Sequence, residues 1–280
     1  MARHCHREDR RAQRARGLGL AHGPVPRPSG AGRPDRRAGA WAVTLLLASV
    51  RSPEEARICL EAGADLIDLK EPALGALGAV DPLIARRVVA LVDGRVPVSA
   101  TVGDLGGRDA RLPDVAAALV EAGVDILKVG CFDAHAAEAI ETLARCHPGQ
   151  VIVPVAFAED PWRELPLARF RASEIRLLML DTRLKGTGGL LAKLAVDELS
   201  ALGAATAVQG LALGLAGGLT LADLPQVLAQ GPAVVGLRGA LCDGAREGGL
   251  SAGRMAAARA AVPRQTAASK QRRWRHDFVA

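Results

Sequence analysis

The chain has 280 residues, 49% of them hydrophobic, which is enough for one large core or one α/β barrel, and no apolar run of about 20 residues predicts a membrane span. Its net charge of +6 comes from the ends: residues 1–40 hold ten arginines against three acids, residues 259–280 hold six basic residues against one, and residues 41–258 therefore sum to −6. An acidic body without tyrosine disfavours nucleic-acid binding by the folded part of the chain.

Residues 1–40 are rich in Arg, Gly and Pro and have no apolar periodicity. We expect them to be a disordered arm, or the product of a start codon assigned too far upstream. They lack the apolar segment of a secretory signal. We therefore expect that deleting them leaves activity and cooperative unfolding unchanged.

From Trp41 onward, apolar strand patterns alternate with helical patterns. The strands are continuously apolar, as parallel strands buried on both faces are. The predicted strands cover residues 43–49, 66–70, 97–102, 125–130, 151–158, 177–181, 211–216 and 233–238. The predicted helices cover residues 52–63, 81–94, 113–123, 136–146, 166–173, 196–208, 223–230 and 251–261.

Eight strand–helix units in this order predict a (β/α)8 TIM barrel over residues 41–262, followed by a basic tail at 263–280. A doubly wound open sheet is the structural alternative. It has less support, because no GxGxxG motif follows the first strand.

Cysteine and histidine indicate no metal site. The five cysteines are scattered and form no CxxC pair, which is typical of reduced thiols in a cytoplasmic protein. His135 and His147 are the only histidines between the tails, which argues against a multi-histidine metal site or a histidine-based triad. We expect no metal and no other cofactor.

Lysine is the informative residue type, because only five of the 36 basic residues are lysines. Unlike arginine, lysine can lose its proton and form a Schiff base. The five are Lys70, Lys128, Lys185, Lys193 and Lys270.

Several of these lysines fall at the C-terminal strand ends, where barrels carry their active sites. Lys70, Lys128, Asp181 and Arg238 lie at the ends of the second, fourth, sixth and eighth predicted strands, and Lys185 follows four residues after Asp181. Alternate strands fill one interior layer of a barrel, so these side chains are expected to converge.

Asp68 shares a strand face with Lys70, which places an acid beside an amine at a buried strand end. A structural salt bridge is the alternative to a catalytic cluster. Since burying an ion pair stabilises poorly, we favour a catalytic role for the whole set.

Glycine-rich turns end the last two strands. Gly217 and Gly218 follow the seventh strand, and Gly239 follows Arg238. Barrels often bind phosphate at these two loops, so we predict that these four residues bind it. Tight turns that need a positive φ are the alternative for the glycines. The Gly-rich, basic loop at residues 181–189 is expected to close over an anionic substrate.

Together the motifs resemble the (5-formylfuran-3-yl)methyl phosphate synthase family, which makes 4-(hydroxymethyl)-2-furancarboxaldehyde phosphate for methanofuran. The resemblance covers roughly residues 42–245. It rests on Asp68-Leu69-Lys70-Glu71-Pro72 with Gly75 and Gly78, Ser99-Ala100-Thr101-Val102-Gly103-Asp104, Lys128-Val129-Gly130, Leu180-Asp181-Thr182 with Lys185, Leu215-Ala216-Gly217, and Arg238-Gly239-Ala240.

The resemblance implies a Schiff-base lyase that condenses two glyceraldehyde 3-phosphates, losing phosphate and water, in one-carbon metabolism. It implies Lys70 as the Schiff-base lysine and Lys128 as the proton acceptor. Asp68, Asp181 and Lys185 would assist proton transfers and phosphate departure.

One stretch departs from the family pattern. Where the family often has Tyr-Ala-Asp after its fifth strand, this chain has Phe157-Ala158-Glu159-Asp160. The sequence leaves open which of the two acids takes the role of the family's Asp.

Two other functions remain open from the sequence. One is a class I aldolase of another specificity on phosphorylated sugars, which would use the same lysine and phosphate loops. The other is a non-catalytic binding protein that uses its basic tails. We expect a small-molecule triose phosphate as the partner, with no membrane partner. The oligomeric state, a homo-oligomer included, stays open.

Overall fold

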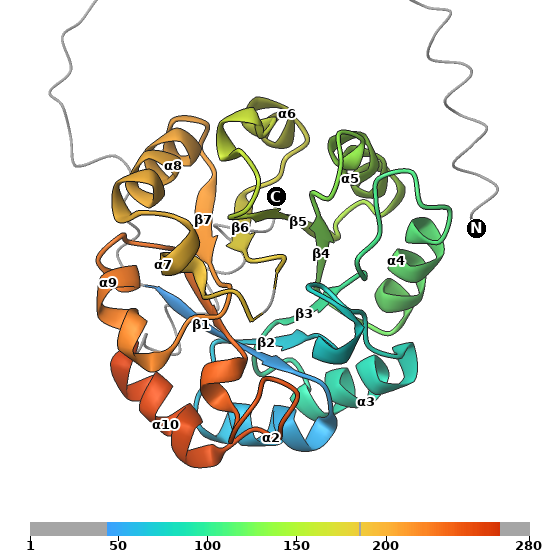
Figure 1. The fold of residues 1–280 in the computed structure, drawn as a ribbon. Helices are drawn as coiled ribbons and strands as arrows, with labels where there is room; N and C mark the ends of the chain where they lie inside the picture. Colours follow the sequence, from blue (N-terminus) through green and yellow to red (C-terminus); the bar gives the residue numbers. More distant parts are fainter. Residues whose placement is uncertain (1–43, 185, 264–280) are drawn as a thin grey trace, which may run out of the picture. The chain divides into compact units, whose positions relative to one another are not determined.

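The computed structural model describes residues 44–184 and 186–263, which form a closed barrel of eight parallel strands in chain order. Figure 1 looks down the barrel, with the helices arranged around the strands. The strands are β1 Leu45–Val50, β2 Leu66–Leu69, β3 Val98–Thr101, β4 Ile126–Gly130, β5 Val151–Phe157, β6 Leu177–Asp181, β7 Ala212–Leu215 and β8 Val234–Leu237. The predicted TIM barrel is confirmed.

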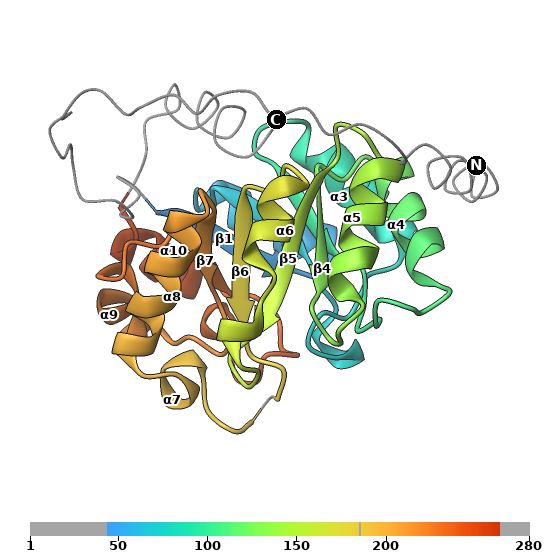
Figure 2. The same cartoon turned by 90° about the horizontal axis from the view of Figure 1, so that it is seen from above.

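Helices alternate with these strands. The α-helices are α2 Pro53–Glu61, α3 Pro82–Val92, α4 Leu112–Glu121, α5 Ala136–Cys146, α6 Leu167–Ala172, α7 Leu190–Lys193, α8 Val196–Val208, α9 Leu224–Leu228 and α10 Ala252–Ala261. Short 3-10 helices cover η1 Pro72–Leu74, η2 Trp162–Glu164, η3 Leu221–Asp223 and η4 Gly239–Leu241. Figure 2 shows α7 and the loop after β6 beyond the C-terminal ends of the strands.

Local sequence signals explain where the elements begin. Ser52 caps α2 and accepts a hydrogen bond from the backbone N–H of Glu55, with Pro53 in the first turn. Each predicted strand and each of the eight predicted helices is present within about two residues of its predicted bounds. The sequence did not predict α7, which is four residues long and follows two glycines.

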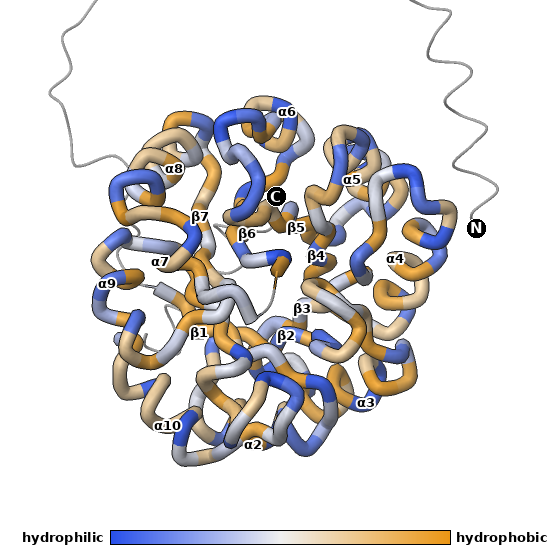
Figure 3. The backbone as a smooth tube through the Cα atoms, viewed as in Figure 1, coloured by the Kyte–Doolittle hydropathy of each residue, from blue (hydrophilic) through white to orange (hydrophobic). Residues whose placement is uncertain are grey.

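Side chains of the strands alternate between two apolar clusters. One lies inside the barrel and includes Leu66, Ile126, Phe157 and Met179, whereas the other lies between strands and helices and includes Leu127. Figure 3 shows hydrophobic segments along the strands and hydrophilic segments on the surrounding helices and loops. Because Asp68, Lys70 and Lys128 lie an even number of residues from Leu66 or Ile126, they continue the interior face.

A buried ion pair fastens the last helix to the N-terminal end of the barrel. Arg259 Nη1 of α10 donates to Asp65 Oδ2 at 2.7 Å and to the carbonyl of Gly63 at 3.0 Å, and its Nη2 donates to the carbonyl of Val262 at 2.6 Å. The side chains of Arg259 and Asp65 are 3% and 1% exposed. Asp65 also accepts the backbone N–H of Leu46 in β1, so this pair joins the two ends of the barrel sequence.

The structure bears on two further expectations, about a membrane span and about the cysteines. No helix within residues 44–184 and 186–263 is long and apolar enough to cross a membrane. Cys59, Cys131 and Cys242 are free thiols, but Cys146 is disulfide-bonded, so the expectation of uniformly reduced cysteines is wrong at that position. The predicted arm at 1–40 lies outside the described residues, and so does the tail from 264 onward.

Candidate active site

Two lysines and two aspartates form crossed ion pairs inside the C-terminal end of the barrel. Lys70 Nζ lies 3.0 Å from Asp181 Oδ2, and Lys128 Nζ lies 2.7 Å from Asp68 Oδ1. All four side chains are less than a tenth exposed. The predicted convergence of the even-numbered strands is therefore present. Asp68 of β2 pairs with Lys128 of β4, two strands along the barrel, however, rather than with its strand neighbour Lys70.

Asp68 is held by hydroxyl groups from both neighbouring strands. Ser49 Oγ of β1 donates to Asp68 Oδ2 at 2.8 Å, and Ser99 Oγ of β3 donates to Oδ1 at 2.6 Å. With Lys128, both oxygens of this fully buried carboxylate are engaged as acceptors. Asp68 is thus arranged to orient the amine of Lys128. The sequence prediction did not assign the two serines, although Ser99 belongs to a motif that it used.

Burial lowers the pKa of the Lys128 ammonium group, and the positive charge of Lys70 lowers it further. The carboxylates of Asp68 and Asp181 act in the opposite direction and raise it, but the net shift is downward. A lysine with a lowered pKa can accept a proton closer to neutral pH.

Arg238 has a structural environment that the sequence did not predict. Its guanidinium forms a two-pronged ion pair with Glu55 of α2, at 2.5 and 3.2 Å. It also donates to the carbonyls of Ser49, Arg246 and Gly248 at 2.9–3.2 Å. A guanidinium has five N–H groups, and these contacts use all of them. The geometry therefore favours Arg238 as the anchor of the β8 loop over the predicted phosphate ligand.

The glycines after β7 occupy conformations that other residues adopt with strain. Gly217 has φ 99° and Gly218 has φ 59°. A Cβ on Gly217 would lie 2.7 Å from the backbone nitrogen of Thr182, so the turn also needs the space. The backbone N–H groups of Gly218 and Gly239 make no hydrogen bond within the described part of the chain. The turn after β7 therefore needs glycine for its conformation, and Gly218 and Gly239 also leave backbone N–H groups available to a ligand.

The acids after β5 hold the loop after β6. Glu159 accepts the backbone N–H groups of Arg183 and Leu184 at 2.9 and 3.0 Å, and Lys193 Nζ of α7 lies 3.2 Å away. Partial burial raises the pKa of Glu159, but these hydrogen bonds outweigh burial, so its pKa is lowered. Asp160 instead pairs with the guanidinium of Arg183.

Arg183 received no role of its own from the sequence, although it lies in the basic loop at residues 181–189 that was expected to close over an anionic substrate. Its guanidinium carbon lies 4.8 Å from the ring centroid of Phe157 and 5.6 Å from that of Phe132. In a chain with so many arginines, one more gave no signal; only its position two residues after Asp181, on the same parity, could have drawn attention to it. The predicted site residue Lys185 lies outside the described residues.

The loop after β2 is held from both sides. Asp104 accepts the backbone N–H groups of Ala76 and Leu77 at 2.9 and 2.6 Å. Arg246 Nη2 donates to the carbonyls of Pro72 and Gly75 at 2.7 and 3.0 Å. The segment that follows Lys70 is therefore fixed by the loops after β3 and β8.

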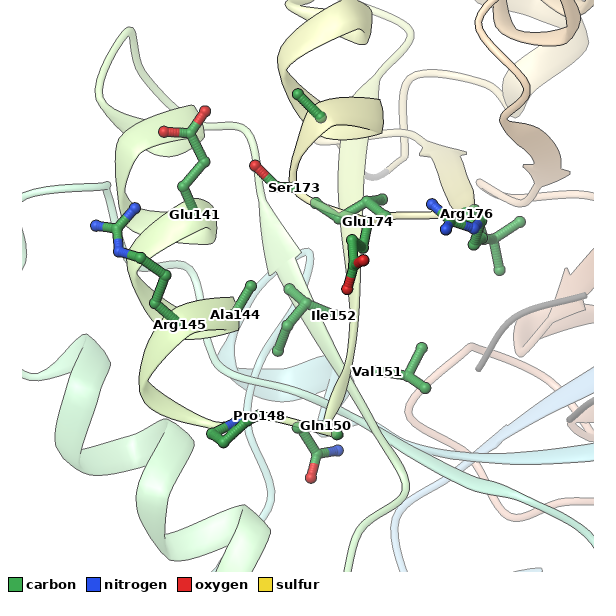
Figure 4. A pocket seen from close by; sticks show the side chains of 14 residues that line it. Glu141, Ala144, Arg145, Pro148, Gln150, Val151, Ile152, Ser173, Glu174 and Arg176 are labelled. Atoms are coloured by element: carbon green, nitrogen blue, oxygen red, sulfur yellow. The ribbon is translucent and has the colours of Figure 1, made fainter. Parts of the chain in front are cut away.

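A separate pocket of about 620 Å³ lies at the opposite end of the barrel. Figure 4 shows Glu141, Arg145, Gln150 and Arg176 around it. Its walls are the C-terminal part of α5 and the N-terminal ends of β5 and β6. Neither paired lysine borders it, so its position argues against a part in lysine chemistry.

Comparisons with known proteins identify the family of the chain. Residues 46–259 match the family model described as 4-HFC-P synthase. A Methylorubrum extorquens protein, named provisionally as a (5-formylfuran-3-yl)methyl phosphate synthase, is 43% identical over 197 residues, which cover 70% of this chain and 82% of that protein. The Methanosarcina acetivorans protein of that name is 32% identical over 216 residues, covering 72% of this chain and 92% of its own length.

Solved structures with lower identity share the barrel. Phosphoribosyl anthranilate isomerase from Thermus thermophilus superposes with a TM-score of 0.56 at 17% identity, covering 78% of this chain and 98% of its own. A 3-hexulose-6-phosphate synthase superposes with a TM-score of 0.54 at 18% identity, covering 79% of this chain and 100% of its own. These likenesses concern the fold alone. The match over residues 46–259 shows that the chain is an enzyme of the 4-HFC-P synthase family.

Proposed function

We propose that this enzyme condenses two molecules of glyceraldehyde 3-phosphate to (5-formylfuran-3-yl)methyl phosphate, with release of one phosphate and two molecules of water. The single observation that carries the proposal is the pair of buried lysines in crossed ion pairs with Asp68 and Asp181. A carbonyl substrate and a lysine amine can form an imine, which makes the neighbouring carbon acidic. A second amine nearby can then take the proton.

In this mechanism Lys70 attacks the aldehyde carbon and water leaves as the imine forms. Lys128 accepts the proton from the carbon next to the imine, which its lowered pKa supports. Asp68 keeps the Lys128 amine in place, and Asp181 accepts the hydrogen bond of Lys70 and passes protons on. Lys185 would assist phosphate departure. The product's use in methanofuran synthesis and a cytoplasmic location belong to the same proposal.

One substrate phosphate is proposed to bind at the glycine turns after β7 and β8. The backbone N–H groups of Gly218 and Gly239, with Gly217 shaping the turn, support this assignment. Arg238 contributes by holding the β8 loop through Glu55.

The test uses glyceraldehyde 3-phosphate alone. The proposal expects a furan product that absorbs in the near ultraviolet, and borohydride added during turnover should leave a reduced, substrate-derived mass on the peptide that contains Lys70. An aldol product without a furan would favour the class I aldolase of other specificity. A furan formed with no labelled lysine would contradict the covalent mechanism, and a label on Lys128 would reverse the two lysine roles.

A further inference from the structure

The proposed reaction brings two phosphate groups to one barrel mouth, so a second anion site is required in addition to the glycine turns. Each phosphate carries a charge of about −1.5 to −2 at neutral pH. Two such groups repel each other unless each has its own donors. The following inference rests on the proposed function and names the residue that serves the second phosphate.

Four cations at the C-terminal end of the barrel are already engaged with protein oxygens. Lys70 and Lys128 lie in the buried ion pairs. Arg238 uses all five N–H groups on protein oxygens. Lys193 donates to Thr187 at 2.7 Å and pairs with Glu159.

Arg183 differs from these cations, because part of its guanidinium has no partner. Only Nη2 makes a hydrogen bond, to Asp160. Nη1 makes none with the described residues, and the buried Nε makes none either. The side chain is 34% exposed, so a ligand can reach it. Two N–H groups of Nη1 therefore remain for an anion.

The guanidinium is also held in a fixed plane at the mouth. One face lies over Phe157, a residue of the barrel interior that stands beside Asp181 in the register of β5 and β6. Phe132 lies against Phe157, with ring centroids 4.9 Å apart. Glu159 fixes the backbone N–H of Arg183. Stacking on a ring leaves the N–H edge of a guanidinium free for the forked contact that phosphate oxygens accept.

Arg183 belongs to the loop after β6, beside β7, but its guanidinium lies over a ring of β5, the neighbouring strand on the other side of β6. Arg183 stacks on a residue of β5 and on Phe132, which follows β4, whereas Gly218 and Gly239 follow β7 and β8. Strands four and eight stand opposite each other in an eight-strand closed barrel. We propose that Arg183 binds the phosphate of the second triose phosphate, across the mouth from the phosphate held at the glycine turns.

The test compares Arg183→Met with wild type in two assays. The concentration of glyceraldehyde 3-phosphate that half-saturates borohydride labelling of lysine reports the first substrate, and the KM for furan formation reports both. We expect labelling to change less than twofold and the KM to rise about tenfold to a hundredfold, because a charge-assisted contact is lost. The KM of Arg183→Lys, which keeps the charge without the planar fork, should lie between those of wild type and Arg183→Met.

Arg163→Met is the matched control. Arg163 also stacks on an aromatic ring, 4.4 Å from the centroid of Trp162, and pairs with a carboxylate, Glu198, but it uses both Nη groups on Glu198. Its KM should stay within twofold of wild type. An unchanged KM in Arg183→Met would overturn the inference, and so would an equal loss of labelling and furan formation, which would assign Arg183 to the first substrate.

Binding of inorganic phosphate separates this inference from the proposed reaction, because it needs no turnover. Calorimetric titration should find two phosphate sites in wild type and one in Arg183→Met. Two sites in both proteins would contradict the role of Arg183 even if furan is formed. One site lost with Arg183→Met would support it even if the product is not a furan.

Discussion

The two ends of the barrel both bury ion pairs, but they use different cations. At the C-terminal end the cations of the central pairs are Lys70 and Lys128, beside the separate Arg238–Glu55 pair that anchors the β8 loop, whereas at the N-terminal end the cation is Arg259. Arginine stays charged under all ordinary conditions, but a buried lysine can lose its proton. The difference fits a structural role for the N-terminal pair, whose charge is permanent, and the proposed chemistry for the C-terminal pairs, whose lysines can lose a proton.

The hydrogen-bond partners sharpen this contrast. The two Nη groups of Arg259 donate to backbone carbonyls and to Asp65, an environment suited to a permanent cation. Lys128 has a lowered pKa because burial and Lys70 act against its charge. An ion pair with a shifted pKa in a site of this kind is a candidate for proton transfer.

Replacing Lys70, at the C-terminal end of the barrel, should have the largest effect on turnover. Lys70→Arg keeps a positive charge beside Asp181 but cannot form an imine, so turnover should fall below detection while cooperative thermal unfolding remains. Furan formation and circular dichroism on the same sample measure the two properties. Retained turnover in this variant would remove Lys70 as the nucleophile.

Removing the cation at the N-terminal end of the barrel should lower stability and leave activity unchanged. Arg259→Met removes the guanidinium beside the charged, buried carboxylate of Asp65, which should lower the free energy of unfolding by about 3–5 kcal/mol. At a temperature where the variant is folded, its kcat/KM should match wild type. Urea unfolding followed by fluorescence gives the free energy. A change of less than about 1 kcal/mol would show that the pair adds little to stability.

Asp68→Asn tests whether the carboxylate sets the proton affinity of Lys128. The charge of Asp68 raises the pKa of Lys128, so its removal should lower that pKa further. Since a proton acceptor must be neutral, the acidic limb of the kcat/KM profile should move to lower pH. The profile from pH 5 to 9 measures it. A shift to higher pH would contradict the assigned direction.

The smallest expected effect concerns the loop after β6. Glu159→Gln weakens the hydrogen bonds to Arg183 and Leu184 and should lower the free energy of unfolding by about 1 kcal/mol at neutral pH. The folded-state pKa of Glu159 is lowered, so its contribution is present above the unfolded-state pKa and is lost as pH falls through the folded-state value. The difference between wild type and variant should therefore shrink below about pH 4.5.

Much of the fold could be predicted because the strands are short, continuously apolar and regularly spaced. The convergence of Lys70, Lys128 and Asp181 followed from strand parity. Strand parity did not predict which acid pairs with which lysine. Such a contact between strands depends on strand tilt and register rather than on spacing along one strand. The pairing of Asp68 with Lys128 therefore had to be observed.

Arginine shows a second limit of sequence reasoning. Arg238 lies at a strand end, as a phosphate ligand would, yet its partner Glu55 is 183 residues away in the chain. Arg183 was missed because nothing in its neighbourhood predicts that Phe132 and Phe157 stack beneath it. The role of an arginine depends on contacts with residues distant in the chain, which the sequence does not reveal. The scarcity of lysine, by contrast, is visible in the sequence itself.

The two long-range arginine contacts have a consequence for synthesis of the chain. Arg238 binds Glu55 and Arg259 binds Asp65, at sequence separations of 183 and 194 residues, and both join the first βα unit to the last. While the ribosome still holds the last strand, the nascent chain has an open sheet with two unpaired edges, at β1 and β7. The sheet can close only after β8, Val234–Leu237, has emerged, and the Arg259 contact forms later still, so a chain stalled before β8 exposes edges of the kind that make folding intermediates prone to aggregate.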